Sequence, residues 1–406
     1  MKKIMLNNDW LFGVWGEENS DLKPIRLPHS VAVMPLHYSD PEQYEGTWRY
    51  QRVLPVCRQA STRYILHFEG VAQQAEVYIN DVPVGRHRCG YTAFALDITE
   101  SLYTDRDSLL KVKVDSHEDP AIPPFGFVID YLTYGGIYRD VWLEETSEDS
   151  IERVAVFAGA DGTLRAELTY RGTRKLPLHY RVLSADGVCI FRGEEKEPVQ
   201  FFQQRLSGIE TWSHETPVLY TLEATYGGDV RSVSFGFRSI AFDDNHLYVN
   251  GRPVFLQGLN RHQAYPYVGY AMPHRLQAED ARILKEELHV NTVRTSHYPQ
   301  DQSFLDACDQ LGLYVITEIP GWQHIGDATW KKQALQNTQD MILQNINHPG
   351  ILMWGVRINE SQDDDAFYQE TNALAHALDA SRPTTGVRYL ENSSLLEDIY
   401  AYNDFS

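Results

Sequence analysis

Residues 347–360 read Asn-His-Pro-Gly-Ile-Leu-Met-Trp-Gly-Val-Arg-Ile-Asn-Glu. The continuous apolar run from Ile351 to Trp354 predicts a strand that is buried on both faces. The run leads to Asn359 and Glu360, a polar pair at the point where such a strand would emerge. Catalytic groups of a parallel-stranded barrel sit at the carboxyl ends of its strands, and a carboxylate beside an amide suits general acid/base work. The alternative is a Glu in a surface loop that contacts only water.

The surrounding residues, 241–406, alternate between strand-like and helix-like patterns. Strands are predicted at 254–258, 292–294, 313–319, 351–358, 384–388 and 398–403, and helices at 276–288, 301–311, 331–344 and 366–378. This order predicts a parallel sheet with right-handed crossovers. A (β/α)8 barrel needs about 250 residues, and an open sheet of this kind would leave two edges unpaired. We therefore expect residues 241–406 to be the N-terminal part of a TIM barrel, incomplete in this chain and continued in a longer protein.

The first 240 residues carry a different pattern, with short alternating segments separated by turn residues. Such alternation predicts antiparallel β-sandwiches. We expect a jelly-roll β-sandwich over residues 1–148. Residues 149–240 have the length of an immunoglobulin-like β-sandwich. No Cys-Trp-Cys core is present there, so this second prediction depends on strand count alone.

Composition limits the classes of partner. The chain has 406 residues and a net charge of −20, with acidic and basic residues spread along it. This argues against nucleic acid or an anionic membrane, since both attract a basic surface. No apolar run approaches the roughly 18 residues of a membrane span, the N-terminus has too short an apolar stretch for a secretion signal, and the four cysteines are widely spaced. We expect reduced thiols and a cytoplasmic protein.

Three further polar clusters fall at predicted strand ends, at residues 258–262, 291–299 and 317–320. Each has a structural alternative: a His at a strand end is often only a satisfied polar residue, and Arg294 could be a buried ion-pair partner. Four clusters at the same end of consecutive strands, counting Asn359-Glu360, predict a polar pocket for a hydroxyl-rich ligand.

The sequence resembles glycoside hydrolase family 2, the β-galactosidase and β-glucuronidase group. Residues 291–299 read Asn-x-x-Arg-Thr-Ser-His-Tyr-Pro and are followed by Phe304-Leu305, Asp309 and Gly312, as in the first signature of that family. Residues 347–360 match its acid/base signature, with Gly350 where a small side chain is usual. Residues 44–48 and 134–141 resemble the family's sandwich-domain motifs, so the resemblance covers the whole chain.

The resemblance implies roles for particular residues. Glu360 would be the acid/base that protonates the leaving oxygen and then activates water, and Asn359 would hold the sugar 2-hydroxyl. The residues implied to line or organise the sugar site are His262, His297, Arg294, Asn403 and, from the sandwich domain, Asp130.

Two departures from the family pattern matter. The family nucleophile is a Glu at the end of strand seven, which would lie beyond Ser406, so Glu360 should lack a partner carboxylate at about 5–5.5 Å. The β-galactosidase magnesium site has an acid where this chain has Trp322, although His324 matches a ligand. We therefore expect no cofactor, and the pattern does not favour a divalent ion. No phosphate-binding or dinucleotide fingerprint is present.

The leading hypothesis is a retaining β-glycosidase, most similar to β-galactosidases, whose isolated 406-residue chain is inactive. The alternative is a non-catalytic carbohydrate-binding fragment or inactive remnant, and an inverting mechanism with Asp404 as base is a third. The sugar cannot be read from these residues, and a homo-oligomer is compatible with the pattern.

Overall fold

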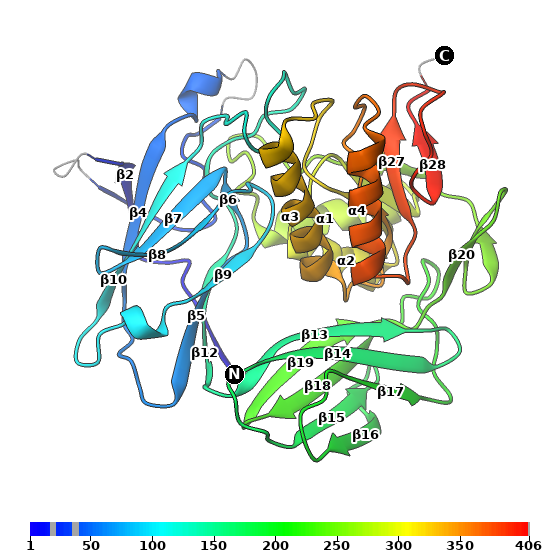
Figure 1. Ribbon diagram of the computed structural model, residues 1–406, viewed down its shortest axis with the longest axis horizontal. Helices are drawn as coiled ribbons and strands as arrows, with labels where there is room; N and C mark the ends of the chain where they lie inside the picture. Colours follow the sequence, from blue (N-terminus) through cyan, green and yellow to red (C-terminus); the bar gives the residue numbers. More distant parts are fainter. Residues whose placement is uncertain (17–21, 35–39, 405–406) are drawn as a thin grey trace.

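The computed structural model describes residues 1–16, 22–34 and 40–404. Figure 1 shows three parts: an N-terminal sandwich in blue and cyan, a second sandwich in green, and a helix-covered part in yellow to red. This is the predicted fold class, two β-sandwiches and an incomplete TIM barrel.

The N-terminal sandwich packs two antiparallel sheets face to face. One sheet has the order β1 (Lys2–Met5), β12 (Val141–Ser147), β5 (Thr62–Phe68) and β9 (Phe94–Asp97). The other has β3 (Lys23–Ile25), β2 (Trp10–Val14), β4 (Thr47–Leu54), β10 (Ser108–Asp115), β7 (Gln74–Ile79) and β8 (Val82–His87). A short pair, β6 (Val71–Ala72) and β11 (Gly136–Ile137), and two 3-10 turns, Pro41–Gln43 and Thr99–Ser101, complete it. In β10 every second residue is buried, because alternate side chains point into the core.

The second sandwich also packs two antiparallel sheets face to face. Its sheets are β13 (Ser150–Ala158), β14 (Thr163–Arg171) and β17 (Phe201–Arg205), and β16 (Cys189–Glu195), β15 (Leu178–Leu183), β18 (Tyr220–Tyr226) and β19 (Asp229–Phe235). The buried side chains of both sheets form one core, which includes Leu164, Val182 and Leu222.

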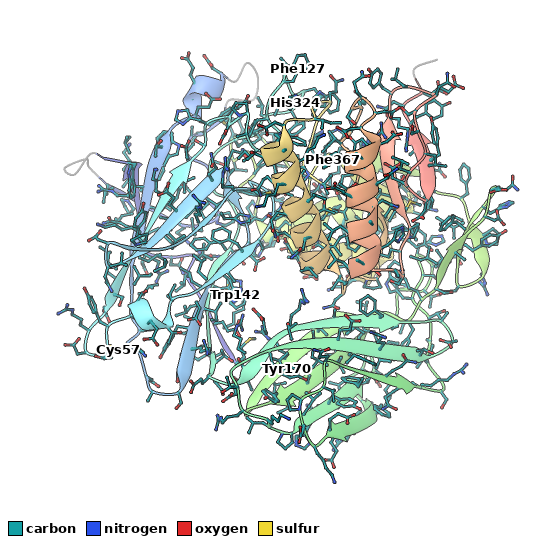
Figure 2. All side chains as sticks on the ribbon, in the orientation of Figure 1. Cys57, Phe127, Trp142, Tyr170, His324 and Phe367 are labelled. Carbon is teal, nitrogen blue, oxygen red and sulfur yellow. The ribbon has the colours of Figure 1, made fainter. Side chains whose placement is uncertain are left out.

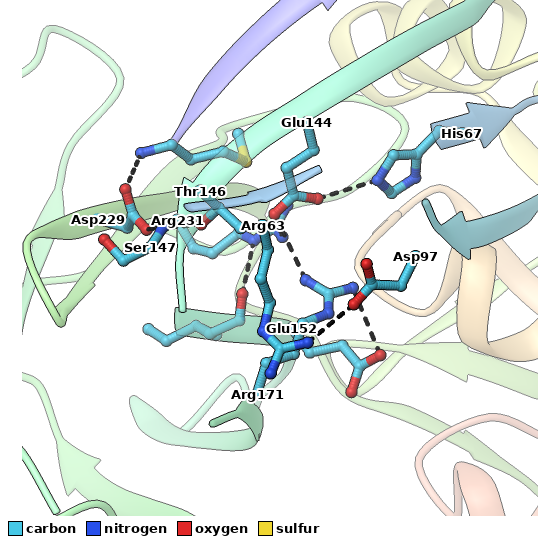
Figure 3. Close-up of polar contacts among 12 residues, drawn as sticks. Arg63, His67, Asp97, Glu144, Thr146, Ser147, Glu152, Arg171, Asp229 and Arg231 are labelled. Carbon is cyan, nitrogen blue, oxygen red and sulfur yellow. Dashed lines mark hydrogen bonds and ion pairs between the residues drawn. The ribbon is translucent and has the colours of Figure 1, made fainter. Parts of the chain in front are cut away.

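A buried carboxylate joins the two sandwiches. Glu144 lies on β12 with a fully buried side chain and accepts hydrogen bonds from His67 of β5 at 2.9 Å and from Arg231 of β19 at 2.5 Å. Arg171 of β14 lies 3.4 Å from the same carboxylate (Figure 3). Burial alone would raise the pKa of Glu144, but His67 and the arginines outweigh it and lower this pKa. The two sandwiches are thus tied by charge-assisted bonds.

The third part begins with a three-stranded antiparallel sheet and continues as a parallel sheet. The antiparallel strands are β20 (Ile240–Phe242), β21 (Leu247–Val249) and β22 (Arg252–Val254). The parallel sheet has the order β23 (Gly258–Asn260), β24 (Thr292–Thr295), β25 (Tyr314–Glu318), β26 (Ile351–Gly355), β27 (Thr384–Arg388) and β28 (Ile399–Tyr402). The first strand prediction, 254–258, was wrong in position. Val254 ends the last antiparallel strand, and the first parallel strand starts at Gly258.

Helices connect most of the parallel strands and cover the sheet. They are α1 (His274–Arg282), extended by a π-turn over Ile283–Glu287, α2 (Gln302–Leu311), α3 (Ala328–Asn345) and α4 (Asp365–Leu378). The carboxylates of Asp301, Asp327 and Asp364 cap α2, α3 and α4 by accepting backbone N–H bonds. All five residues of β26 are buried, as the apolar run predicted.

The parallel sheet is open in the described part of the chain. Strands β23 and β28 each have one neighbour there, so the sheet does not close on itself. None of the described helices is long and apolar enough to cross a membrane.

Candidate active site

The carboxyl ends of the parallel strands bring the predicted polar residues to one edge of the sheet. Arg294 lies on β24, Glu318 ends β25, and Asn359 and Glu360 follow β26. Asn403 follows β28, and its backbone N–H donates to the carbonyl of Arg388 at 2.7 Å. Parallel strands point the same way, so residues far apart in sequence meet here.

Arg294 holds this cluster together. Its Nε donates to Glu318 Oε1 at 2.5 Å and its Nη2 to Glu318 Oε2 at 3.1 Å, a bidentate pair. The same Nη2 donates to Asn359 Oδ1 at 2.7 Å and lies 3.3 Å from His297 Nδ1. Burial alone would raise the pKa of Glu318, but Arg294 and His297 outweigh it and hold this pKa below its ordinary value. Glu318 is therefore held as a carboxylate.

Glu360 is fixed through both backbone and side chain. It is 9% exposed and has a φ of +53°, in the left-handed region that non-glycine residues rarely adopt. Its N–H donates to the carbonyl of Val387 at 2.9 Å, which ties this unusual conformation to β27. One carboxylate oxygen accepts from Gln323 Nε2 at 3.0 Å and the other from Asn403 Nδ2. The carboxylate is thus presented in one orientation by two amides.

Asn359 has one satisfied and one unsatisfied side-chain atom. Its Oδ1 accepts from Arg294, whereas its Nδ2 is buried and has no hydrogen-bond partner among the described residues. Its backbone carbonyl accepts from the N–H of Gln323 at 2.8 Å, which joins the loop after β25 to the end of β26. A buried amide N–H without a partner costs free energy that a ligand oxygen would recover.

The two predicted histidines stand beside this cluster. Their ring centres are 5.6 Å apart, and Tyr131 of the N-terminal sandwich contacts both, at 5.2 Å from His262 and 6.0 Å from His297. Partial burial, with His297 and Arg294 nearby, lowers the pKa of His262 to about 4, so this ring is neutral near pH 7. His262 Nδ1 lies 3.1 Å from the Tyr298 hydroxyl.

Asp130, from the N-terminal sandwich, lies near His297 and Glu360. Its side chain is exposed, and no hydrogen bond joins it to the other predicted site residues in the described chain. Loss of surrounding water raises its pKa, His297 opposes this rise, and the charge of Glu360 adds to it. Asp130 is therefore electrostatically coupled to the cluster without being bonded to it.

The residues at the position of the β-galactosidase magnesium site, Trp322 and His324, do not fit a metal. Trp322 offers only an indole N–H, which donates and cannot ligate, and its ring packs 5.0 Å from that of His297. His324 packs edge-to-face on Trp330 at 5.8 Å.

Three contributors were not singled out from the sequence: Gln323, Tyr131 and the hydroxyl of Tyr298. The position of Gln323 in a strand-end loop was the available signal, because such loops form the sites of barrels. Tyr298 lies within the 291–299 motif. Tyr131 follows Asp130, and nothing else in its sequence context distinguishes it.

Two β-sandwiches followed by parallel strands whose ends gather two carboxylates, three amides and two imidazoles fit the class of multidomain glycoside hydrolases. Residues 15–147 match the description "Glycosyl hydrolases family 2, sugar binding domain", and residues 240–405 match "Glycosyl hydrolases family 2, TIM barrel domain". The chain belongs to glycosyl hydrolase family 2.

Relatives of known name agree. The chain is 42% identical to a β-galactosidase of Thermoanaerobacterium thermosulfurigenes, over 100% of this chain and 61% of that protein. It is 43% identical to a β-galactosidase of Thermoanaerobacter pseudethanolicus, over 99% of this chain and 58% of that protein. The crystal structure of a β-glucuronidase from Parabacteroides merdae superposes with a TM-score of 0.88 at 25% identity, covering 100% of this chain and 59% of that one. The chain therefore spans about three fifths of the length of these relatives.

Proposed function

We propose that the whole protein is a retaining β-glycosidase that removes terminal β-linked sugars, with β-galactosides as the first substrate class to test. Glu360 is the general acid and then the general base, and Asn359 holds the sugar 2-hydroxyl. His262, His297, Arg294, Asn403 and Asp130 shape the sugar pocket. The proposed domains are 1–148, 149–240 and 241–406, the last being the first part of the catalytic barrel.

One observation carries this proposal: the hydrogen bonding of the Asn359 side chain, directly before Glu360 in the chain. Arg294 occupies the amide oxygen of Asn359, so the amide N–H group is the part left for a ligand. A hydrogen bond to the 2-hydroxyl strengthens as an oxocarbenium-like transition state forms, and the neighbouring carboxyl group protonates the leaving oxygen. The two proposed roles fall on consecutive residues that follow a fully buried strand.

The nucleophile is proposed to lie beyond Ser406. Glu318 is a poor candidate, because Arg294 and His297 engage both of its oxygens and lower its pKa, which favours a structural carboxylate. The chain spans 61% and 58% of the two β-galactosidases, which leaves room for further barrel strands in the complete protein.

The test is a Glu360→Gln variant of the complete polypeptide. We expect kcat/KM for alkyl glycosides, whose leaving groups need a proton, to fall about 10²–10⁴-fold. For activated aryl glycosides, whose leaving groups need no proton, the fall in kcat/KM should be far smaller. Glu370→Gln, an exposed glutamate on α4, is the matched control. Full activity of Glu360→Gln on alkyl glycosides would remove Glu360 from the acid role.

A second function is favoured by the sequestered state of Glu318. If the 406-residue chain acts alone, the cluster would bind a sugar without cleaving it. Hydrolysis of alkyl β-glycosides by this chain, abolished in Glu360→Gln, would exclude the non-catalytic alternative. Calorimetry of the folded chain without heat for any β-sugar would also count against a carbohydrate-binding fragment.

A further inference from the structure

A loop of the N-terminal sandwich, residues 125–131, is braced at its first end by the barrel. Trp330 Nε1 on α3 donates to the carbonyl of Phe125 at 3.0 Å. Gly126 follows with a φ of +125°, and a Cβ there would lie 2.2 Å from His324 Nε2. The backbone of Gly126 therefore packs directly on the His324 ring, and only glycine fits this contact and this φ. His324 follows Gln323, whose amide donates to Glu360.

The second end of the loop is braced by the two histidines of the site. The ring of Tyr131 contacts the rings of His262 and His297, and its hydroxyl is buried. Asp130, one residue earlier, is coupled electrostatically to His297 and Glu360. The loop thus runs along the rim of the cluster, from the Gln323–Glu360 side to the histidine side.

Two large apolar side chains are exposed between these braces. Phe127 is 62% and Val128 is 74% exposed. Figure 2 shows Phe127 close to His324 at the upper end of the molecule. The contacts of Phe125 and Gly126 place these side chains beside the Gln323–Glu360 side of the polar cluster. Exposed apolar side chains next to a polar site can form a ligand-binding surface.

We propose that Phe127 and Val128 form an apolar surface that binds the leaving group of the glycoside substrate. The inference rests on the proposed function of Glu360 as acid. The glycosidic oxygen must lie against the Glu360 carboxyl group, so the sugar occupies the side of Asn359 and His297 and the leaving group extends away from them. The Gln323–His324 side of Glu360 leads to Gly126 and Phe127. The preferred substrates are therefore β-glycosides of alkyl or aryl alcohols.

Binding to the complete polypeptide, with Glu360→Gln to suppress turnover, tests this inference. Methyl and n-hexyl glycosides, in both the β-galactoside and the β-glucuronide series, share the sugar and differ in apolar area. Calorimetric titration should show the hexyl compound binding about tenfold more tightly in the series that binds. In the double variant Phe127→Ser/Val128→Ser this ratio should fall to about one. Phe201→Ser, which removes a 50% exposed ring on β17 of the second sandwich, should keep the ratio of Glu360→Gln alone.

The outcomes distinguish failure of the leaving-group surface from failure of the sugar site. Equal affinity for methyl and hexyl compounds in Glu360→Gln alone, or a hexyl preference that survives the double variant, overturns the leaving-group surface and leaves the sugar site standing. Absence of binding in both series, with folded protein, overturns the proposed sugar site and the leaving-group surface together.

Discussion

Arg294 Nη2 donates to Asn359 Oδ1 at 2.7 Å, and this single contact settles which end of the Asn359 amide is occupied. A guanidinium can only donate, so the atom that faces it must be the amide oxygen. The Asn359 N–H group is thereby directed away from Arg294. The same guanidinium donates two hydrogen bonds to Glu318. Because Arg294 lies on β24 and Glu318 on β25, the orientation of Asn359 depends on the pairing of these two strands.

The first prediction concerns the shape of the Arg294 side chain. In Arg294→Lys the charge remains, but a single ammonium cannot donate to Glu318 in bidentate fashion and to Asn359 at once. We expect kcat/KM of the complete enzyme to fall about 10–100-fold and the free energy of unfolding to fall by about 1–3 kcal/mol. Arg275→Lys, an exposed arginine at the start of α1, is the control. Unchanged kinetics in Arg294→Lys would show that Asn359 needs no such support.

The second prediction isolates the sugar contact of Asn359. Asn359→Ala removes the amide proposed to bind the 2-hydroxyl, so kcat/KM for ordinary glycosides should fall about 10²–10³-fold. For 2-deoxy glycosides the same variant should differ little from wild type, since the bond is missing in both. An equal loss for both substrates would assign Asn359 a structural role only.

The third prediction concerns Gln323, whose Nε2 donates to Glu360 Oε2 at 3.0 Å. Gln323→Glu places a second carboxylate beside Glu360, the proposed acid/base, and this like charge makes loss of a proton from Glu360 harder. The alkaline limb of the kcat/KM profile should therefore move to higher pH. Gln323→Leu keeps the size, removes the bond and should lower kcat.

A matched control for Gln323 is Gln336→Leu, because Gln336 also donates to a carboxylate, that of Asp340 at 2.8 Å, from an exposed position on α3. An alkaline limb that stays in place in Gln323→Glu would mean that the Gln323–Glu360 bond is absent in the working enzyme.

The alternation of strands and helices in the barrel could be predicted because each element carries its own periodicity. Strand 384–388 was predicted with the bounds that the structure has, and the buried run at 351 begins β26 where expected. The first parallel strand was misplaced for a physical reason. Strand β23 is short and all three of its residues are exposed, so no apolar run marks it. Its pairing to β24 depends on Gly258, where a Cβ would meet the carbonyl of Thr292 at 2.0 Å.

The clustering of polar residues could be predicted where they follow strand ends and not where the contacts depend on loops. Arg294 and Asn359 lie at or just beyond strand ends, and position along the strand is readable from the sequence. The bond from Gln323 to Glu360 and the contact of Tyr131 with two histidines come from segments that fold over the sheet edge from elsewhere. No local pattern encodes such contacts. In the second sandwich, β16 and β17 were not predicted, because β16 has no buried residue and β17 has one, Phe202, so neither carries a clear apolar face.

The last prediction uses Asp340, which lines a cavity of about 840 Å³ between the two sandwiches and helices α2 and α3. Burial raises the pKa of Asp340 from 3.8 to about 6, so between these values the folded chain binds more protons than the unfolded chain, and stability falls as pH rises through this window. Asp340→Asn removes the buried charge and should raise the free energy of unfolding by about 1–3 kcal/mol at pH 8, with a smaller gain at pH 4.5. The measurement is urea unfolding of both proteins at the two pH values, with the exposed Asp105→Asn as control. A loss of stability at pH 8 in Asp340→Asn would mean that the ionised Asp340 is stabilised by contacts that the folded chain gains in solution.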